Sequence, residues 1–356
     1  GPLGLASLTG GTQALYVPDA NNHRIQKFTS TGAFITKWGS FGTGAGQFNN
    51  PSGIAVHSLT NVLYVTDNIN HRIQKFDSSG NFILMWGFGV QDGSPVFQTC
   101  TSSCQAGIGG SGDGQFNGPQ DVAVDSIGNV YVVDGLNHRI QRFTSTGAFI
   151  IKWGSFGTDN GQFNNPSGIA VDSIGNVYVA DSSNIRIQRF NSTGAFITKW
   201  GSAGDGDGQF GFGTQDVAVD GSDNVYVTAR KISGGNRIQK FTSTGAFLTK
   251  FGSTGTGDGE FGLVIDIALW SGNVYASDFS NHRIQKFGLC PTPDLIIAAP
   301  SSFPPSPVVV GTLMTFSGTV QNIGSCSTGA LPFTTRLTID GITISPDKST
   351  GPLAAG

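Results

Sequence analysis

The sequence predicts an all-β fold built from repeats, and three observations support that prediction. Glycine is abundant, with 53 of 356 residues, and Glu260 is the single glutamate, so strand and turn formers outnumber helix formers. A ten-residue segment, clearest at residues 181–190, recurs in six near copies, one of them divergent. The arginines of these copies follow one another at steps of 48, 67, 47, 51 and 46 residues. A period in the forties without helices is typical of a β-propeller or a similar repeat array.

The repeat at residues 165–202 predicts four antiparallel strands. Short apolar or alternating runs are separated by turns that contain Gly and Asn, where the backbone needs a positive φ. Four such strands joined by tight turns make one propeller blade. The expected strands are residues 168–172, 177–181, 186–190 and 195–201.

The last repeat lacks an outer strand of its own. Six first strands are expected, at residues 4–7, 53–56, 121–124, 168–171, 216–219 and 265–268. Five fourth strands follow, and they end at Trp38, Trp86, Trp153, Trp200 and Phe251. After Phe287, the run Thr-Ser-Thr-Gly-Ala-Phe is replaced by Gly-Leu-Cys-Pro-Thr-Pro. An unpaired sheet edge of this kind needs a cover, an intramolecular partner or another chain.

Several strings of the repeat resemble a known family. Gly-Gln-Phe, Pro-Ser-Gly-Ile-Ala-Val-Asp, Asn-Val-Tyr-Val-Ala-Asp and Asn-His-Arg-Ile-Gln-Lys-Phe are similar to the NHL repeat, over residues 4–287. The resemblance implies a six-bladed β-propeller. It implies no particular activity, because the fold hosts lyases, hydrolases, RNA-binding proteins and scaffolds.

Residues 290–356 have a different composition, with prolines at the start and two alternating runs at residues 312–320 and 334–340. Pro-Asp-Leu-Ile-Ile, Thr-Val-Gln-Asn-Ile-Gly and Thr-Arg-Leu-Thr-Ile-Asp-Gly resemble the start of a CARDB module. That resemblance implies an immunoglobulin-like sandwich of a kind named for cell-adhesion proteins. Such a sandwich needs about seven strands, and this segment supplies about four. We therefore expect a propeller over residues 1–289 and a partial sandwich over residues 290–356.

The charged positions of the repeat are interpreted as structural, because a slot that every blade fills alike does not make a unique active site. Aspartate is expected to bond turn N–H groups, and arginine to bridge blades. Four histidines share one slot, and an axial cation held by them is the alternative to a structural role. We assign no catalytic residue, no metal ligand and no cofactor, and no zinc-binding set like that of the related amidating lyases can be mapped. The structural residues are Asp19, Arg24, Asp67, Arg72, Asp134, Arg139, Asp181, Arg186, Arg237, Asp278 and Arg283, and the histidines are His23, His71, His138 and His282.

The four cysteines form two pairs, Cys100 with Cys104 and Cys290 with Cys326. Neither pair has the spacing of a zinc ribbon or a thioredoxin-like site, so disulfides in an oxidising compartment are the simpler interpretation. Two free thiols in a loop are the alternative for the first pair. The expected location is extracellular or at the cell surface.

Two segments break the repeat and mark a candidate contact face. Residues 90–112 are an insertion of about 20 residues between a fourth and a first strand, and residues 229–235 replace the loop after a second strand. In an up-and-down blade these two loop types emerge on the same face. The candidate contact residues are Cys100, Cys104, Arg230 and Lys231, and neutral loop drift is the alternative.

Composition excludes two classes of partner. The net charge of −3 and the dispersed basic residues argue against nucleic acid, and no apolar run has the length of a membrane helix. We expect a non-enzymatic scaffold or adhesion protein that associates with itself, as a filament joined by donated strands, or with other surface proteins or glycans. A propeller enzyme (a lyase or hydrolase) and a glycan- or peptide-binding propeller are the alternatives.

Overall fold

The computed structural model describes residues 6–7, 14–232 and 234–288, together with four short strands in the remainder of the chain. The chain divides into two compact units, Gly1–Phe287 and Gly288–Gly356. The helices in the described part are single three-residue turns of 3-10 type: η1 (Ala20–Asn22), η2 (Gly135–Asn137) and η3 (Ser182–Asn184). None of the helices described has the length and apolar character needed to cross a membrane. The expectation of an all-β chain is confirmed.

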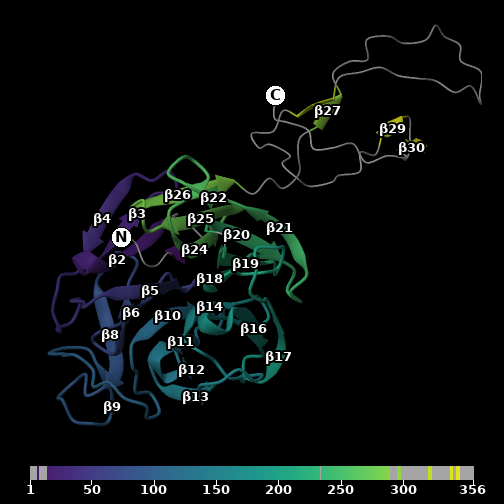
Figure 1. Ribbon diagram of the computed structural model, residues 1–356. Coiled ribbons are helices and arrows are strands. Elements are labelled where there is room, and N and C mark those ends of the chain that lie inside the picture. The colour runs from purple at the N-terminus through teal and green to yellow at the C-terminus, as the bar shows by residue number, and fades with distance from the viewer. Residues whose placement is uncertain are drawn as a thin grey trace, which may run out of the picture. The chain divides into compact units, whose positions relative to one another are not determined.

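The first unit contains six sheets arranged as blades around one axis (Figure 1). Within each blade the strands follow chain order and pair antiparallel, because tight turns with Gly or Asn at positive φ connect them. The strands are β1 (Ala6–Ser7), β2 (Leu15–Asp19), β3 (Arg24–Phe28) and β4 (Phe34–Trp38) in blade 1; β5 (Pro51–Val56), β6 (Leu63–Asp67), β7 (Arg72–Phe76), β8 (Phe82–Phe88) and β9 (Phe97–Cys100) in blade 2; β10 (Pro119–Val124), β11 (Val130–Asp134), β12 (Arg139–Phe143) and β13 (Phe149–Trp153) in blade 3; β14 (Pro166–Val171), β15 (Val177–Asp181), β16 (Arg186–Phe190) and β17 (Phe196–Trp200) in blade 4; β18 (Gly213–Val219), β19 (Val225–Arg230), β20 (Asn236–Phe241) and β21 (Phe247–Phe251) in blade 5; and β24 (Val264–Trp270), β25 (Asn273–Asp278) and β26 (Arg283–Gly288) in blade 6. The short pair β22 (Ser253–Thr254) and β23 (Glu260–Phe261) lies in the connector between blades 5 and 6.

The described residues give blade 6 three strands, β24 to β26, and the segment expected to lack a fourth strand lies outside the described residues. All five predicted outer strands are present and end at the predicted aromatic residues, except that β8 continues to Phe88.

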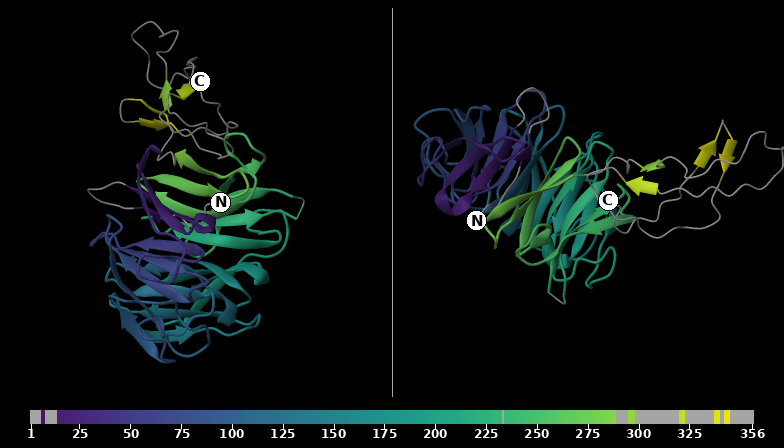
Figure 2. Two further views of the ribbon diagram at one scale, coloured as in Figure 1. Left: turned by 90° about the vertical axis from the view of Figure 1, so that its left-hand side faces the viewer. Right: turned by 90° about the horizontal axis from the view of Figure 1, so that it is seen from above.

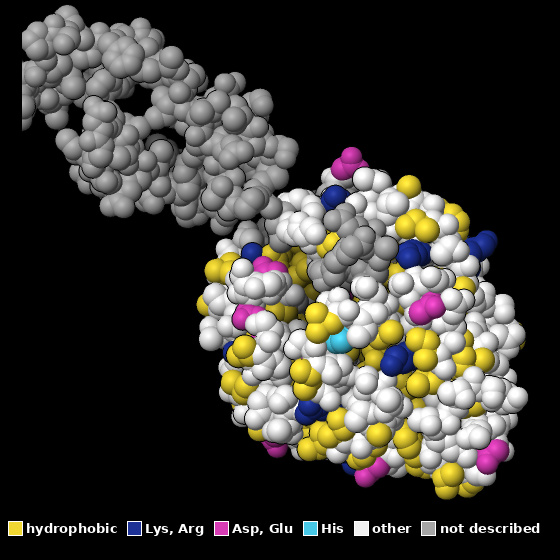
Figure 3. Space-filling view, turned by 180° about the vertical axis from the view of Figure 1, so that it is seen from behind, with side chains coloured by type: hydrophobic (Ala, Val, Ile, Leu, Met, Phe, Trp, Pro, Cys, Tyr) yellow, Lys and Arg dark blue, Asp and Glu magenta, His cyan; other side chains and the backbone are white. Residues whose placement is uncertain are grey.

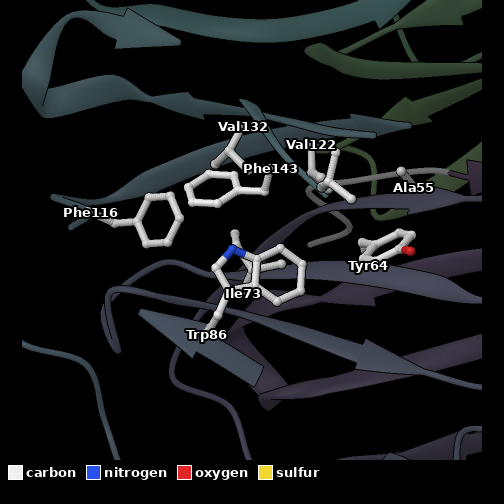
Figure 4. Close-up of a cluster of buried hydrophobic side chains, with 9 residues drawn as sticks. Ala55, Tyr64, Ile73, Trp86, Phe116, Val122, Val132 and Phe143 are labelled. Carbon is white, nitrogen blue, oxygen red and sulfur yellow. The ribbon is translucent and has the colours of Figure 1, made fainter. Parts of the chain in front are cut away.

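The hydrophobic core lies between neighbouring blades rather than inside any one of them. The second strands of blades 1 to 4 are buried along their full length, because the adjoining blades cover both of their faces. The cluster between blades 2 and 3 is representative, with Tyr64, Trp86, Phe116 and Phe143 packed together (Figure 4). Sequence repeats therefore produce a ring of similar cores.

The ring closes where blade 1 lies beside blade 6 (Figure 2). Leu15 and Val17 of β2 form one buried cluster with Trp270 and Tyr275 of blade 6. The Tyr275 hydroxyl donates a hydrogen bond to the Ser30 carbonyl oxygen at 3.3 Å, across 245 positions of sequence. In the described part of the chain, closure therefore combines this side-chain packing with the hydrogen bond between Tyr275 and Ser30.

The insertion at residues 90–112 adds β9, which pairs antiparallel with β8 as a fifth strand of blade 2. Cys100 at the end of β9 and Cys104 form a disulfide. Both cysteines are buried against Met85 and Val90. The insertion is therefore a folded extension of the blade.

In the second unit the structure describes two strand pairs. β27 (Leu295–Ile297) pairs antiparallel with β28 (Val320–Asn322), and β29 (Leu337–Ile339) pairs antiparallel with β30 (Ile342–Ile344). The predicted pairing of Cys290 with Cys326, and most of the expected sandwich, lie outside the described residues.

Candidate functional site

Four outer-strand tryptophans lie between their own blade and the next one. Trp86 of β8 is representative: its ring centroid lies 6.0 Å from that of Tyr64 in the same blade and 5.9 Å from that of Phe143 in blade 3 (Figure 4). Gly147, in the turn after β12, lies directly over the indole, where an added Cβ would approach the ring to 3.0 Å. The same arrangement surrounds Trp38, Trp153 and Trp200, with Gly80, Gly194 and Gly245 over the rings. We call this position the aromatic slot.

The equivalent slot between blades 6 and 1 is open in the described part of the chain. Tyr275 and Phe28 occupy the positions of Tyr64 and Phe143, and a cavity of about 610 Å³ lies between them. Gly32 corresponds to Gly147, and an added Cβ there would meet nothing within 4 Å. Leu15, Val17, Ile284 and Lys286 also line the cavity.

Burial confirms that this slot differs from the others. The third-strand phenylalanines of blades 2 to 5 are completely buried, whereas Phe28 is only partly buried. In the same way, the third-strand isoleucines of blades 1 to 5 are 0% exposed, whereas Ile284 on β26 is partly exposed. In the described part of the chain, the outer edge of blade 6 therefore combines a strand edge without a partner strand and a cavity lined by both apolar and polar side chains.

In blades 2, 3, 4 and 6 the predicted Asp and Arg residues form a hydrogen-bond network that holds the blade to the connector entering it. In blade 2, Asp67 Oδ2 accepts hydrogen bonds from Arg72 Nε at 2.8 Å and from Asn70 Nδ2 at 2.9 Å. The Arg72 guanidinium also donates to the Gln47 carbonyl oxygen at 2.8 Å, in the connector from blade 1. Both charged side chains are 0% exposed. Burial raises the pKa of Asp67 and lowers that of Arg72, although each is opposed by the charge of the other.

The same pairing recurs in four other blades and fails in blade 5. The recurring pairs are Asp19–Arg24, Asp134–Arg139, Asp181–Arg186 and Asp278–Arg283, at 2.7–2.9 Å. In blade 5 Ala229 replaces the aspartate, and Arg237 Nε has no hydrogen-bond partner among the described atoms. Arg237 still donates to the carbonyl oxygens of Asp205 and Gln209. The glycine-rich run at residues 204–208 therefore contributes carbonyl oxygens to an arginine.

Three of the four histidines that occupy the same position of the repeat also form hydrogen bonds to connectors. The Nδ1 atoms of His23, His71 and His138 accept backbone hydrogen bonds from Asn50, Gly118 and Asn165 at 3.0–3.1 Å. No group of three or more His, Cys, Asp or Glu residues in the described ranges is positioned to hold a metal ion.

The two irregular segments lie on the connector face, and one part of the predicted contact set is wrong. Gln105 of the insertion accepts a hydrogen bond from Arg72, and Ile232 N donates to Asp205 Oδ1 at 2.6 Å. Arg230 is exposed and Lys231 is partly exposed, but Cys100 and Cys104 are only 2% and 8% exposed. The disulfide packs on β8 and is not a contact element. In the view of Figure 3, charged side chains are dispersed among hydrophobic ones, with no large area of one sign.

The sequence analysis missed a group of aspartates at the central channel. Asp121, Asp216 and Asp266 line an axial cavity of about 220 Å³. Asp121 Oδ2 accepts a hydrogen bond from Ile169 N at 2.9 Å, and Asp216 Oδ2 accepts one from Ile267 N at 2.8 Å. Each carboxylate thus joins its own blade to the next. The sequence did contain a signal for this group. One position of the first strand is Gly in blades 2 and 4 but Asp in blades 3, 5 and 6.

The carboxyl groups of Asp121 and Asp216 hold protons more tightly than ordinary aspartates. Burial and the nearby Asp216 carboxylate raise the pKa of Asp121 well above its usual value. Burial raises the pKa of Asp216 to about 7.

Because the pKa of Asp216 is raised in the folded protein, we expect the free energy of unfolding to depend on pH, and we expect Asp216→Asn to remove that dependence. The folded protein keeps a proton that the unfolded chain releases above about pH 4, so the stabilising contribution is full below pH 4 and is lost as the pH rises through about 7. Asparagine still accepts the Ile267 hydrogen bond but does not titrate. Between pH 4 and pH 7.5 we expect the free energy of unfolding of the wild type to fall, relative to the variant, by on the order of 2 kcal/mol. Urea denaturation at a series of pH values measures it.

The exposed Asp113→Asn is the matched control and should give a curve parallel to the wild type, because the Asp113 side chain is 59% exposed. If Asp216→Asn also runs parallel to the wild type, Asp216 does not hold this proton.

A scan against protein families identifies the repeat. The NHL repeat model matches residues 48–76, 116–143, 163–190 and 261–287. The chain is a six-bladed β-propeller that contains NHL repeats. Among curated proteins, RING finger protein nhl-1 of Caenorhabditis elegans is 38% identical over 58 residues, which are 16% of this chain and 6% of that protein. The chain spans a small part of the length of that relative.

Solved structures with a similar propeller have diverse functions. The nidogen/laminin complex has a chain with TM-score 0.52 and 14% identity, covering 78% of this chain and 90% of the other. Streptogramin B lyase has TM-score 0.51 and 14% identity, covering 80% and 92%. The gluconolactonase XC5397 of Xanthomonas campestris has TM-score 0.51 and 14% identity, covering 78% and 82%. At these identities the likeness establishes the propeller fold alone.

Proposed function

We propose that this NHL-repeat propeller is a non-enzymatic extracellular scaffold that associates with itself. In this proposal, residues 294–356 of one copy complete blade 6 of a neighbouring copy, near residues 273–287. The observation that carries the proposal is the edge of β26, which has no partner strand among the described residues, beside the open aromatic slot. A strand edge with unpaired N–H and C=O groups is a template for pairing with another strand.

The physical chemistry of the edge supports association. The cavity side chains Phe28 and Ile284 stay partly exposed, and Lys286 stays exposed, until a strand covers them. Because the donor segment and the acceptor edge are different parts of the chain, the contact is heterologous. Repeated contacts of this kind need not close into a ring and can extend as a filament. The Cys100–Cys104 disulfide supports an oxidising compartment, outside the cell or at its surface.

A second candidate function is catalysis or ligand binding at the central channel. The observation in its favour is the group of buried aspartates with raised pKa values, since such groups are enriched at active sites. A lyase and a gluconolactonase share the fold. Against it, the Asp121 and Asp216 carboxylates already accept backbone hydrogen bonds between blades. If a cation bound on the propeller axis, these carboxyl groups are the ones that would line its site.

Deleting residues 289–356 tests self-association. We expect the full chain to form dimers or larger species and the shortened chain to be monomeric, measured by light scattering after size-exclusion chromatography. Circular dichroism of the shortened chain should keep the β spectrum, because the first unit forms a compact body. A shortened chain that forms the same assemblies as the full chain would exclude this mode of association.

A further inference from the structure

The open slot has the chemistry of the four slots that hold a tryptophan. Its walls are the ring of Tyr275 on one side and that of Phe28 on the other. Its floor is apolar, with Leu15 and Val17 of β2. We propose that this cavity binds one aromatic side chain of an added β-strand, and that Phe316 of a second copy supplies it. The inference rests on the proposed self-association and specifies its chemistry.

The intact blades define what the added strand must carry. The outer strand of blade 1 places Trp38 opposite Ile25 of β3, and the outer strand of blade 5 places Phe251 opposite Ile238 of β20. The corresponding residue of blade 6 is Ile284, which is partly exposed. An aromatic residue opposite Ile284 would therefore enter the cavity between Tyr275 and Phe28.

A phenylalanine opposite Ile284 would fill the cavity as well as a tryptophan would. The indole Nε1 atoms of Trp38, Trp86, Trp153 and Trp200 are buried and have no hydrogen-bond partner in the described structure. The slot therefore makes no use of the indole N–H. Blade 5 has Phe251 at this position, with its ring centroid 5.1 Å from that of Phe287. An aromatic ring, rather than an indole, is what the slot selects.

Phe316 is the aromatic residue best placed in sequence to fill the slot. Residues 289–356 contain three aromatic residues, Phe303, Phe316 and Phe333. Phe303 is followed by two prolines and Phe333 is preceded by one, and proline cannot donate to a strand ladder. Phe316 lies in the alternating run at residues 312–320. In the sequence it follows Thr312 and Met314 at steps of two, as Phe251 follows Phe247 and Thr249, which is the spacing of one face of a strand.

A peptide experiment tests the chemistry of the slot. The probe is a dye-labelled peptide with the sequence of residues 31–39, Thr-Gly-Ala-Phe-Ile-Thr-Lys-Trp-Gly, added to the full-length Phe316→Ala protein, and fluorescence anisotropy is measured. We expect saturable binding. The same peptide with Ala in place of its Trp should bind at least about tenfold more weakly, since burying an aromatic side chain is worth about that factor. Equal binding of the two peptides, or none by either, would overturn the slot chemistry.

Variants of the full chain test the donor. Phe316→Ala should lower the association constant at least about tenfold in analytical ultracentrifugation, and the matched control Phe303→Ala should leave it unchanged. Unchanged association of Phe316→Ala would overturn the assignment of Phe316. If the wild type is monomeric and its slot binds the peptide only after Phe316→Ala, the segment fills the slot of its own chain and the second copy is excluded. Loss of association on deleting residues 289–356, without peptide binding, would leave the proposed function standing and the slot inference overturned.

Discussion

Replacing Asp67 with alanine is expected to lower the free energy of unfolding by about 3–5 kcal/mol, because it leaves a buried charge without its partner. Asp67 accepts three side-chain hydrogen bonds, from Asn70, Arg72 and Gln74. None of these donors gains water when the carboxylate is removed, since the site is completely buried. Urea denaturation followed by tryptophan fluorescence measures the change.

Asp19→Ala is the matched control in blade 1, where the ion pair is more accessible. The side chains of Arg24 and Asp19 are 29% and 12% exposed, against 0% for both Arg72 and Asp67. Water therefore compensates part of the loss, and we expect Asp19→Ala to be the milder of the two. Similar losses for the two variants would show that burial does not determine the strength of this network.

Replacing Trp86 with alanine is expected to lower the free energy of unfolding by about 3–5 kcal/mol, which is similar to the effect of Asp67→Ala, because it empties a filled aromatic slot. Trp86 is 0% exposed and packs between Tyr64 and Phe143. Its indole N–H has no partner, so Trp86→Phe loses contact area but no hydrogen bond. We therefore expect Trp86→Phe to cost much less, and thermal unfolding of both variants measures the difference. A Phe variant as unstable as the Ala variant would contradict the account of the slot as a site for any aromatic ring.

Much of the fold was predictable because each blade repeats the same local signals. The alternation in residues 177–181 and the Gly-Asn turns specify strands and hairpins without long-range information. The expected lack of an outer strand in blade 6 rests on the same signals, since Gly-Leu-Cys-Pro-Thr-Pro after Phe287 replaces the run of the other repeats, and it stays a prediction. The fifth strand, β9, was not predicted, because the insertion has no counterpart in the other repeats.

The sites were less predictable, because they depend on how distant segments meet. Asp121 and Asp216 belong to strands that were located correctly, but their approach to one another depends on ring closure. The open slot is bounded by Phe28 and Tyr275, which come from opposite ends of the propeller sequence. The burial of Cys100 and Cys104 was missed because a close cysteine pair in an insertion suggests an exposed loop.

The measurement that tests the central claim most directly is a mixing experiment with two full-length variants. Ile284→Lys places a charge in the acceptor cavity but keeps the donor segment, and Phe316→Ala keeps the cavity but removes the donor ring. Ile174→Lys is the matched control, because Ile174 is 77% exposed in a turn of blade 4 and should not affect association. Sedimentation velocity is measured on each variant alone and on an equimolar mixture. The account predicts two monomeric variants that form a one-to-one complex when mixed; variants that associate alone, or that stay monomeric when mixed, would contradict it.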